Sequence, residues 1–301
     1  MDVVLGSPRG FCAGVVRAID IVERALQKFG SPIYVRHEIV HNPHVVDRLR
    51  GMGAIFVDEL SQIPDNQRVI FSAHGVPPQI WSEARGRGLQ IIDGTCPLVT
   101  KVHNEALKYS REGATVVLVG HRDHPEVIGT AGEVPGGAII VETVEEAESI
   151  KISNAETVAA LTQTTLSVED TREILKVLED RFPSLTIRND ICYATSNRQQ
   201  ATKALAQEVD LVLVIGARNS SNCNRLREVA ENSGVPAYLV NTPQEIDTIP
   251  MNNVFKVGII SGASTPEDLV QAVVARLSPE KVLEHQVVPE DVQFVLPQEL
   301  R

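Results

Sequence analysis

Residues 91–97 read Ile-Ile-Asp-Gly-Thr-Cys-Pro, and the rest of the chain is organised around this stretch. The apolar run stops at Asp-Gly, a short loop presents Cys96, and Pro97 suits the first position of a helix. We therefore expect Cys96 to lie between the end of a strand and the N-terminus of a helix. Amide groups and the helix dipole at such a position favour a thiolate over a thiol.

The same construction occurs twice more in the sequence. Residues 3–5 run into a turn that contains Gly and Pro and carries Cys12, and a helical pattern follows. Near Cys192, a polar turn leads into a helix that we expect to begin near Ser196, a residue that suits an N-cap. The three turns predict three similar units, each of which contributes one cysteine.

Composition and charge indicate an ordinary globular protein of 301 residues, with 43% hydrophobic and 22% charged residues. The net charge of −11 argues against a general nucleic-acid-binding or acidic-membrane-binding surface. The sequence has no run of about 18 apolar residues and no charged-then-apolar leader. Its four cysteines lack the spacing of a secreted disulfide framework. We expect a cytoplasmic protein with reduced thiols.

Short apolar runs alternate with helix-length segments from end to end, which predicts an α/β fold with parallel sheets. The expected strands are 3–5, 33–35, 55–57, 69–72, 90–92, 115–119, 138–141, 157–161, 185–188, 210–215, 237–240 and 255–260. The expected domains are 14–96, 97–193 and 194–281 together with 1–13, followed by a C-terminal tail over 282–301 that wraps the surface.

Polar clusters recur at the ends of the expected strands and support a threefold repeat. Each cysteine turn is followed by two such clusters, at 41–43 and 72–75, at 120–126 and 162–165, and at 219–222 and 261–264. In parallel α/β sheets, ligands bind just outside the carboxyl ends of the strands. We expect the three units to gather their cysteines and polar loops around a common centre.

Cys12, Cys96 and Cys192 suit three kinds of role. They can hold zinc with a fourth ligand, they can hold an iron–sulfur cluster with one iron left open, or they can be buried apolar side chains. Their position in turns rich in Gly, Pro and Asp favours ligands over core residues. Cys223 has no counterpart in the other units, and we assign it no function.

The remaining polar residues at strand ends divide by their chemistry. Neutral or weakly basic donors that suit a phosphate or diphosphate at helix N-termini are His41, His74, His124, Ser220, Ser221, Asn222 and Ser264. No P-loop is present and residues 6–14 do not match GxGxxG, which argues against a nucleotide. Glu126, the last residue of the cluster at 120–126, is either a partner of a helix N-terminus or a proton donor. Surface or core-filling positions suit His37, His44, His103 and His285.

Several motifs, read together, resemble the family of 4-hydroxy-3-methylbut-2-enyl diphosphate reductases of the LytB type. They span nearly the whole chain in order: RGFCAG (9–14), EIVHNP (38–43), SAHG (72–75), DGTCP (93–97), GHRDHPE (120–126), TQTT (162–165), ICYAT (191–195), NRQ (197–199), NSSN (219–222) and SGAS (261–264). Serine is the residue expected by this resemblance where Cys223 stands.

The resemblance implies three α/β units with pseudo-threefold symmetry around a central [4Fe–4S] cluster, one per chain, with a fourth iron open to substrate. It implies an oxidoreductase that removes the C4 hydroxyl of an allylic diphosphate with two electrons and protons, giving isopentenyl and dimethylallyl diphosphates. The implied partner is an electron-donor protein such as ferredoxin or flavodoxin. No nucleic acid or membrane is expected to bind. The implied roles are cluster ligation by Cys12, Cys96 and Cys192, substrate binding by His41, His74, His124, Thr164, Ser220, Ser221, Asn222 and Ser264, and catalysis by Glu126, His124 and Thr164.

Two alternative functions remain open from the residues alone. A zinc-dependent hydrolase would use the three cysteines with a histidine and would contain neither iron nor acid-labile sulfide. A non-catalytic iron–sulfur redox sensor would have no need of the diphosphate donors.

Overall fold

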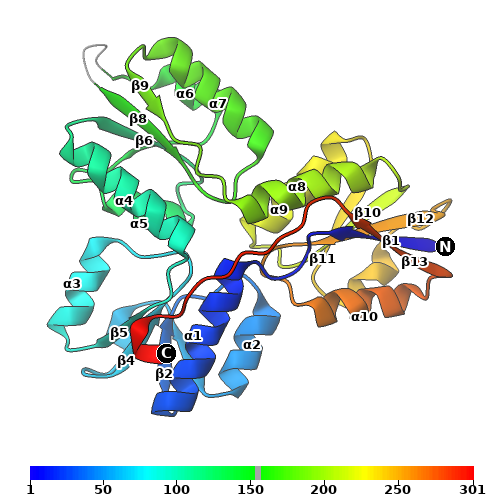
Figure 1. The fold of residues 1–301 in the computed structure, drawn as a ribbon, viewed down its shortest axis with the longest axis horizontal. Helices are drawn as coiled ribbons and strands as arrows, with labels where there is room; N and C mark the ends of the chain where they lie inside the picture. The colour runs from blue at the N-terminus through cyan, green and yellow to red at the C-terminus, as the bar shows by residue number, and fades with distance from the viewer. Residues whose placement is uncertain (153–156) are drawn as a thin grey trace. The chain divides into compact units, whose positions relative to one another are not determined.

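The computed structural model describes residues 1–152 and 157–301, and Figure 1 shows its ribbon. The strands are β1 (Asp2–Ser7), β2 (Ile33–Arg36), β3 (Ala54–Val57), β4 (Arg68–Phe71), β5 (Gln90–Asp93), β6 (Thr115–Val119), β7 (Ile139–Val141), β8 (Val158–Thr162), β9 (Leu185–Ile187), β10 (Leu211–Ile215), β11 (Ala237–Val240), β12 (Lys256–Ser261) and β13 (Lys281–Gln286). Each segment that the sequence predicted as a strand overlaps one of these, so those predictions are confirmed.

Helices connect most of the strands. The α-helices are α1 (Ala13–Phe29), α2 (Pro43–Gly51), α3 (Pro78–Gly86), α4 (Pro97–Arg111), α5 (Pro125–Gly132), α6 (Val144–Ser149), α7 (Val168–Arg181), α8 (Tyr193–Ala206), α9 (Ser221–Asn232) and α10 (Glu267–Leu277). Short 3-10 helices are η1 (Leu60–Gln62), η2 (Pro243–Thr248) and η3 (Gln298–Leu300). Among the described residues, no helix has both the length and the apolar character needed to cross a membrane.

The strands form three parallel sheets, which confirms the predicted α/β class. Sheet A has the order β11-β10-β12-β1-β13, sheet B has β3-β2-β4-β5, and sheet C has β7-β6-β8-β9. The helices between the strands are long enough for the crossover connections that parallel pairing requires.

All three sheets are wound in the same order. In sheets B and C the first strand is central, the second lies outside it, and the third and fourth follow on the other side. Sheet A repeats this order with β10, β11, β12 and β1, and β13 is added beyond β1. The strands before Cys96, Cys192 and Cys12, which are β5, β9 and β1, therefore take the fourth place in their sheets. The order reverses between β2 and β4, β6 and β8, and β10 and β12, and ligands bind at such reversals.

Sheet A is covered on both faces, and alternate residues of β1 show how (Figure 1). Val3 packs in the same apolar cluster as Val270 of α10, whereas Val4 packs with Leu205 of α8 and Leu226 of α9. Because successive strand residues point to opposite faces, the apolar run 3–5 in the middle of β1 fits a strand that is buried on both sides.

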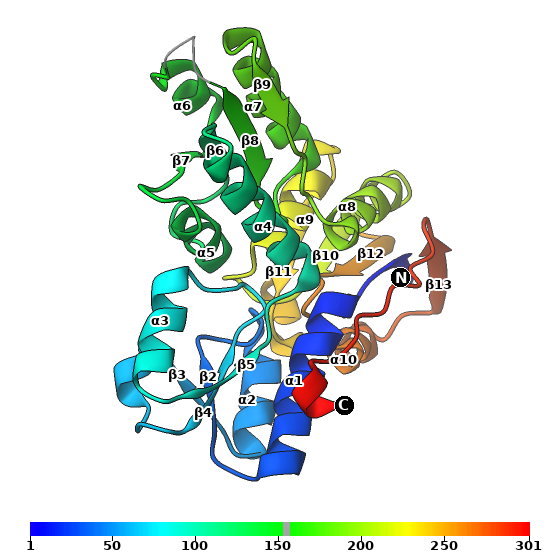
Figure 2. The same cartoon turned by 60° about the vertical axis from the view of Figure 1, so that its left-hand side comes forward.

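Sheet C has the same two-sided construction (Figure 2). Val117 of β6 packs with Leu178 of α7, and its neighbour Leu118 packs with Val102 of α4 and Val127 of α5. On one face of sheet B, Phe71 of β4 meets Trp81 of α3 edge to face, with ring centroids 4.9 Å apart. The cores thus fix the helices that begin at the carboxyl ends of the strands.

The chain divides into two compact units, each described by itself. Unit 1 comprises 1–16, 41–45 and 192–293 and contains sheet A, whereas unit 2 comprises 17–40, 46–191 and 294–301 and contains sheets B and C. The predicted division into 14–96, 97–193, and 194–281 with 1–13 stays a prediction.

The predicted C-terminal tail is corrected at its start, because residues 281–286 form β13. This strand pairs with β1 along its whole length, from Asp2 opposite Lys281 to Ser7 opposite Gln286. Most of its residues are exposed and it mixes charged with apolar side chains, as an edge strand commonly does. Because β13 has no apolar run, the sequence did not predict it as a strand.

Candidate functional site

The three candidate cysteines share one local geometry. Each follows the fourth strand of a sheet and directly precedes a helix. Their carbonyl oxygens accept the first helical hydrogen bond, at 2.9 Å from Val16 N–H to Cys12, 2.9 Å from Thr100 N–H to Cys96, and 3.1 Å from Ser196 N–H to Cys192. The turn position predicted for these cysteines is therefore correct in all three units.

One predicted helix start was wrong. The helix after Cys192 begins at Tyr193, with Cys192 as its N-cap, and not near Ser196. Ser196 lies inside the first turn, where its hydroxyl donates to the carbonyl oxygens of Cys192 and Tyr193, at 3.2 Å each. A serine can satisfy its hydroxyl in this way within a helix as well as at a cap, so its presence alone did not locate the boundary.

The sulfur atoms differ in accessibility. Cys12, Cys96 and Cys192 are half-buried, whereas Cys223 is 0% exposed. A Cβ atom placed on Gly216 or Gly262 would lie 2.4 or 2.2 Å from the Cys223 sulfur, so the two glycines leave the space that the thiol fills. Burial raises the pKa of Cys223. Cys223 is thus a packed core thiol, whereas the other three cysteines are only half-buried.

In unit 1, one hydrogen bond joins the Cys12 and Cys192 turns. The Tyr193 hydroxyl, next to Cys192, accepts the N–H of Ala13, next to Cys12, at 3.3 Å. Burial raises the pKa of Tyr193 to about 12 against the lowering effect of the Ala13 amide, and the nearby Cys12, Glu290 and Cys192 raise it further. The tyrosine therefore keeps its proton at neutral pH, and two of the candidate ligands lie close to the same side chain.

Unit 1 also gathers candidate diphosphate donors around Asn222. Its Oδ1 accepts the N–H of Ala263 at 3.0 Å. Because this acceptor must be the amide oxygen, the other terminal atom of the side chain is the nitrogen Nδ2. The side chain is 5% exposed, and Nδ2 has no hydrogen-bond partner among the described residues. A buried donor without a partner is costly, so this amide is suited to an acceptor supplied by a ligand.

The serines around Asn222 differ in the hydrogen bonds that they make. Ser220 is the N-cap of α9 and accepts the N–H of Cys223 at 3.4 Å, so its own hydroxyl hydrogen is not used in that bond. Ser221 is the first residue of α9. Ser264 donates to the carbonyl oxygen of His41 at 3.1 Å, so it must rotate before it can donate to an anion. The structure thus brings together Ser220, Ser221, Asn222, Ser264 and the His41 backbone.

In unit 2, the central group is Glu126, the second residue of α5, which is 3% exposed. Its Oε1 accepts the Thr164 N–H at 2.7 Å and its Oε2 accepts the Thr164 hydroxyl at 2.9 Å. Burial raises the pKa of Glu126, and the two Thr164 hydrogen bonds and His103 oppose that rise. The raised pKa favours a carboxyl group that carries a proton.

The two candidate histidines of unit 2 lie edge to face, with the ring centroids of His74 and His124 5.7 Å apart. His124 is the N-cap of α5, and its Nδ1 accepts the N–H of Glu126 at 3.2 Å, so a neutral ring carries its proton on Nε2. The Cys96 N–H donates to the carbonyl oxygen of Ala73, beside His74, at 3.0 Å. Cys96, His74, His124, Glu126 and Thr164 therefore belong to one unit.

A further buried residue beside this group is His103, for which the sequence predicted a surface or core-filling position. His103 is 8% exposed and lies on α4, and its Nδ1 is 3.3 Å from Oε1 of Glu133. Its ring lies so close to Gly75 and Gly129 that a Cβ on either would come within about 3 Å of it. The glycines allow the imidazole to touch the loop after His74 and the helix that carries Glu126. Gly75 directly follows His74, and this was the only sequence signal for the contact.

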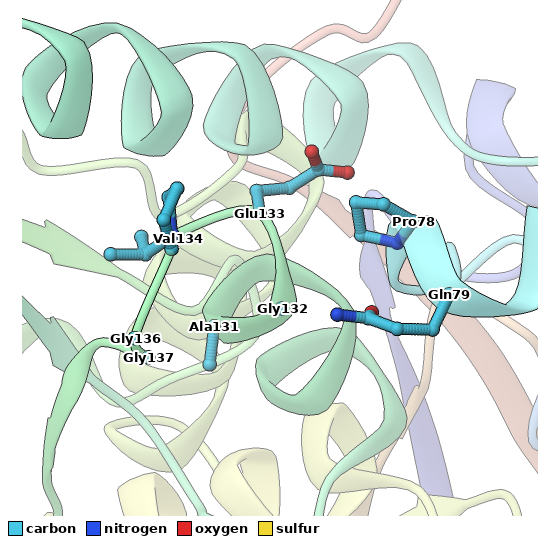
Figure 3. A pocket seen from close by; sticks show the side chains of 9 residues that line it. Pro78, Gln79, Ala131, Gly132, Glu133, Val134, Gly136 and Gly137 are labelled. Carbon is cyan, nitrogen blue, oxygen red and sulfur yellow. The ribbon is translucent and has the colours of Figure 1, made fainter.

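Glu133 also lines a hollow of about 600 Å³ formed by the start of α3 and the segment that follows α5. Figure 3 shows the Glu133 side chain and those of Pro78 and Gln79 around this space. Within either unit, the described residues hold no group of three His, Cys, Asp or Glu side chains arranged as a metal site. The predicted ligands divide between the units, with Cys12 and Cys192 in unit 1 and Cys96 in unit 2.

Comparisons with known proteins identify the family of this chain. The model of the family described as LytB protein matches residues 3–278. The chain is 53% identical to a protein of Aromatoleum aromaticum, with 100% of this chain and 98% of that protein covered, and 53% identical to one of Tolumonas auensis, with 100% of each covered. Both are named 4-hydroxy-3-methylbut-2-enyl diphosphate reductase.

A solved structure is also similar over the whole chain. It is described as the E-1-hydroxy-2-methyl-but-2-enyl-4-diphosphate reductase from Plasmodium falciparum, and it is 38% identical in sequence. The match covers 100% of this chain and 96% of that chain with a TM-score of 0.96. The sequence motifs, the three parallel sheets and these matches agree, and the chain belongs to the LytB protein family.

Proposed function

We propose that this chain is an iron–sulfur oxidoreductase that converts 4-hydroxy-3-methylbut-2-enyl diphosphate into isopentenyl and dimethylallyl diphosphates. This is the terminal reaction of the methylerythritol phosphate route to isoprenoids. The observation that carries the proposal is the shared placement of Cys12, Cys96 and Cys192, each half-buried at the end of the fourth strand of a sheet and at the start of a helix. Membership of the LytB family favours this reaction over a zinc hydrolase or a redox sensor.

Cys12, Cys96 and Cys192 are the thiolates that would hold a [4Fe–4S] cluster with a fourth iron open to substrate. When bound, the cluster supplies single electrons, which side chains cannot supply, and a Lewis-acidic site for the C4 oxygen. The helix N-terminus beside each cysteine favours the anionic form that a metal requires. Cys223 is excluded because its sulfur is enclosed by Gly216 and Gly262.

The diphosphate would bind to the neutral donors at the strand ends. Asn222 contributes an Nδ2 that has no partner among the described residues, and it lies at the N-terminus of α9, where the helix dipole favours an anion. The same role falls to His41, His74, Ser220, Ser221 and Ser264. Binding energy from the diphosphate, which does not react, positions the allylic alcohol for the chemical step.

Glu126 would supply the proton that lets the hydroxyl leave. The C4–O bond breaks and the oxygen departs as water with that proton, while two electrons and a second proton complete the new C–H bond. Burial raises the pKa of Glu126, which favours the protonated form that a proton donor needs. Thr164 fixes both carboxyl oxygens, and His124, whose Nδ1 accepts the N–H of Glu126, would orient the hydroxyl.

We infer that the electrons come from a cytoplasmic donor protein such as a ferredoxin or flavodoxin. Each turnover needs two electrons delivered one at a time, and the chain has no motif for a nicotinamide cofactor. Turnover with a reduced ferredoxin or flavodoxin, measured beside an artificial reductant, tests this inference.

The proposal is tested on protein purified without oxygen, by assay of iron, acid-labile sulfide and turnover of the allylic diphosphate with an artificial reductant. We expect iron and sulfide in the wild type and loss of the brown chromophore in C12S, C96S and C192S. C223S is the matched control and should keep the chromophore. A full cluster in C96S would contradict the ligand assignment, zinc without sulfide would favour the hydrolase, and a cluster without turnover would favour the sensor.

A further inference from the structure

Arg198 is the largest fully buried side chain of the protein's described residues, and it lies on α8 two turns after Cys192. It is 0% exposed, although it carries a permanent charge. A buried charge needs a partner and hydrogen bonds, and it is expensive to keep for stability alone. The groups that Arg198 holds therefore indicate why it is there.

The guanidinium group joins both cysteine turns of unit 1. Its Nη2 donates to the carbonyl oxygen of Gly10 at 2.9 Å, and its Nη1 donates to the carbonyl oxygen of Ala194 at 2.9 Å. Gly10 lies two residues before Cys12, and Ala194 is the second residue of α8, the helix that begins directly after Cys192. One rigid fork of donors thus ties the Cys12 turn to the first turn of α8.

The C-terminal segment holds Arg198 in this position. After β13 the chain, dark red in Figure 1, passes α8, and Glu290 accepts from Nη1 at 3.0 Å and from Nη2 at 3.2 Å. Asn197 adds a third hydrogen bond to Glu290, at 3.1 Å. Glu290 therefore balances the buried charge and fixes the plane of the fork.

We propose that Arg198, held by Glu290, is a positioning residue that keeps the Cys12 and Cys192 turns at the spacing needed to retain one iron–sulfur cluster. The C-terminal segment is then part of the cluster-binding apparatus, although it contributes no ligand. This inference rests on the proposed function, because it requires that both cysteines bind the same cluster.

The test separates positioning from folding. Removing one partner of a buried ion pair destabilises a protein, whereas replacing both with apolar residues of similar volume is often neutral. The double variant R198M/E290M should therefore fold, but it cannot bind the carbonyl oxygens of Gly10 and Ala194. The control is R276M/D247M, which removes the ion pair between α10 and η2 in the same unit.

The measurements are iron and sulfide per chain, the rate of iron release to a chelator, and the EPR spectrum of the reduced cluster, all without oxygen. Thermal unfolding of the iron-free proteins serves as the folding readout. We expect R198M/E290M to release iron at least about tenfold faster than wild type, with an altered EPR spectrum and a near-normal melting temperature. The control should match wild type in all four measurements.

Two milder variants keep the test decisive if the double variant does not fold. R198K keeps the charge but has no fork, and E290Q keeps the shape but has no charge. Faster iron release in R198K than in E290Q supports the proposal. Wild-type release and EPR spectra in the folded variants would overturn it while leaving the proposed function intact, whereas a wild type without iron and sulfide would overturn both.

Discussion

The carboxyl ends of sheets A and C carry the same construction with different chemistry. Glu126 is the second residue of α5 and Asn222 is the second residue of α9, and each helix follows the first strand of its sheet. The side chain of each accepts a backbone N–H from the second residue past the third strand, which is Thr164 at 2.7 Å or Ala263 at 3.0 Å. The two residues are structural equivalents in different units.

What differs is the second atom of each head group. The second oxygen of Glu126 is bound by the Thr164 hydroxyl, whereas Ala263 has no hydroxyl and the Nδ2 of Asn222 has no partner among the described residues. A carboxyl with both oxygens held and a raised pKa suits a proton donor. An amide with an unused buried donor suits an anion. The same local construction thus suits proton transfer in one sheet and diphosphate binding in another.

The strongest test of this comparison is Glu126→Gln. Glutamine keeps the shape and can still accept the Thr164 N–H, but it has no acidic proton to give. We expect kcat to fall about 10²–10⁴-fold, with the cluster and diphosphate affinity retained. Steady-state rates and cluster absorbance check this result. Nearly normal turnover would mean that Glu126 is only a partner of the helix N-terminus.

Asn222→Ala should have the next largest effect, which is a loss of affinity for the diphosphate and not a loss of proton transfer. Losing one hydrogen bond to a charged group costs about 1.5–3 kcal/mol, or roughly ten- to a hundredfold in affinity. Inhibition by plain diphosphate should weaken with substrate binding, and Asn222→Asp should weaken both further because it adds repulsion. If diphosphate inhibition is unchanged in both variants, Asn222 does not contact the diphosphate.

The pH dependence of stability gives a smaller signal that is specific to Glu126. Because burial raises the pKa of Glu126 above its usual 4.5, its favourable contribution is full below pH 4.5 and is lost as pH rises through the raised pKa. The free energy of unfolding of wild type minus that of Glu126→Gln should therefore decrease from pH 4.5 upward. Urea unfolding across this range measures it. A difference that grows with pH would show that the carboxylate is the favoured form.

Cys223→Ser should have the smallest effect. The resemblance leads us to expect serine here, and Ser220 and Thr265 lie close enough to bond a hydroxyl. The free energy of unfolding should change by less than about 1.5 kcal/mol, with turnover and iron content unchanged. A marked loss of diphosphate affinity would instead show that the thiol shapes the pocket around Asn222.

Local features of the sequence located most of the elements and the three cysteine turns. Apolar runs bounded by Gly, Pro and Asp marked the buried strands, since a parallel strand covered on both faces must be apolar throughout. The same reasoning missed β13, whose exposed edge carries charged residues, and it misplaced the start of α8. It also could not reveal Arg198 or His103 as links between distant loops, because the bonds of Arg198 to Gly10 and the contact of His103 with Gly129 join separate segments.

The sequence by itself determined the α/β class, the motifs of the LytB family and the residue types at each strand end. Only the tertiary structure decided which strands pair, and so which polar ends lie at the same edge of a sheet. It placed β1 beside β12, so that the strand before Cys12 completes a sheet made from the other end of the chain. It also made Glu126 and Asn222 equivalent. The reason is physical: pairing depends on backbone hydrogen bonds between remote segments, which leave no mark on the local pattern of side chains.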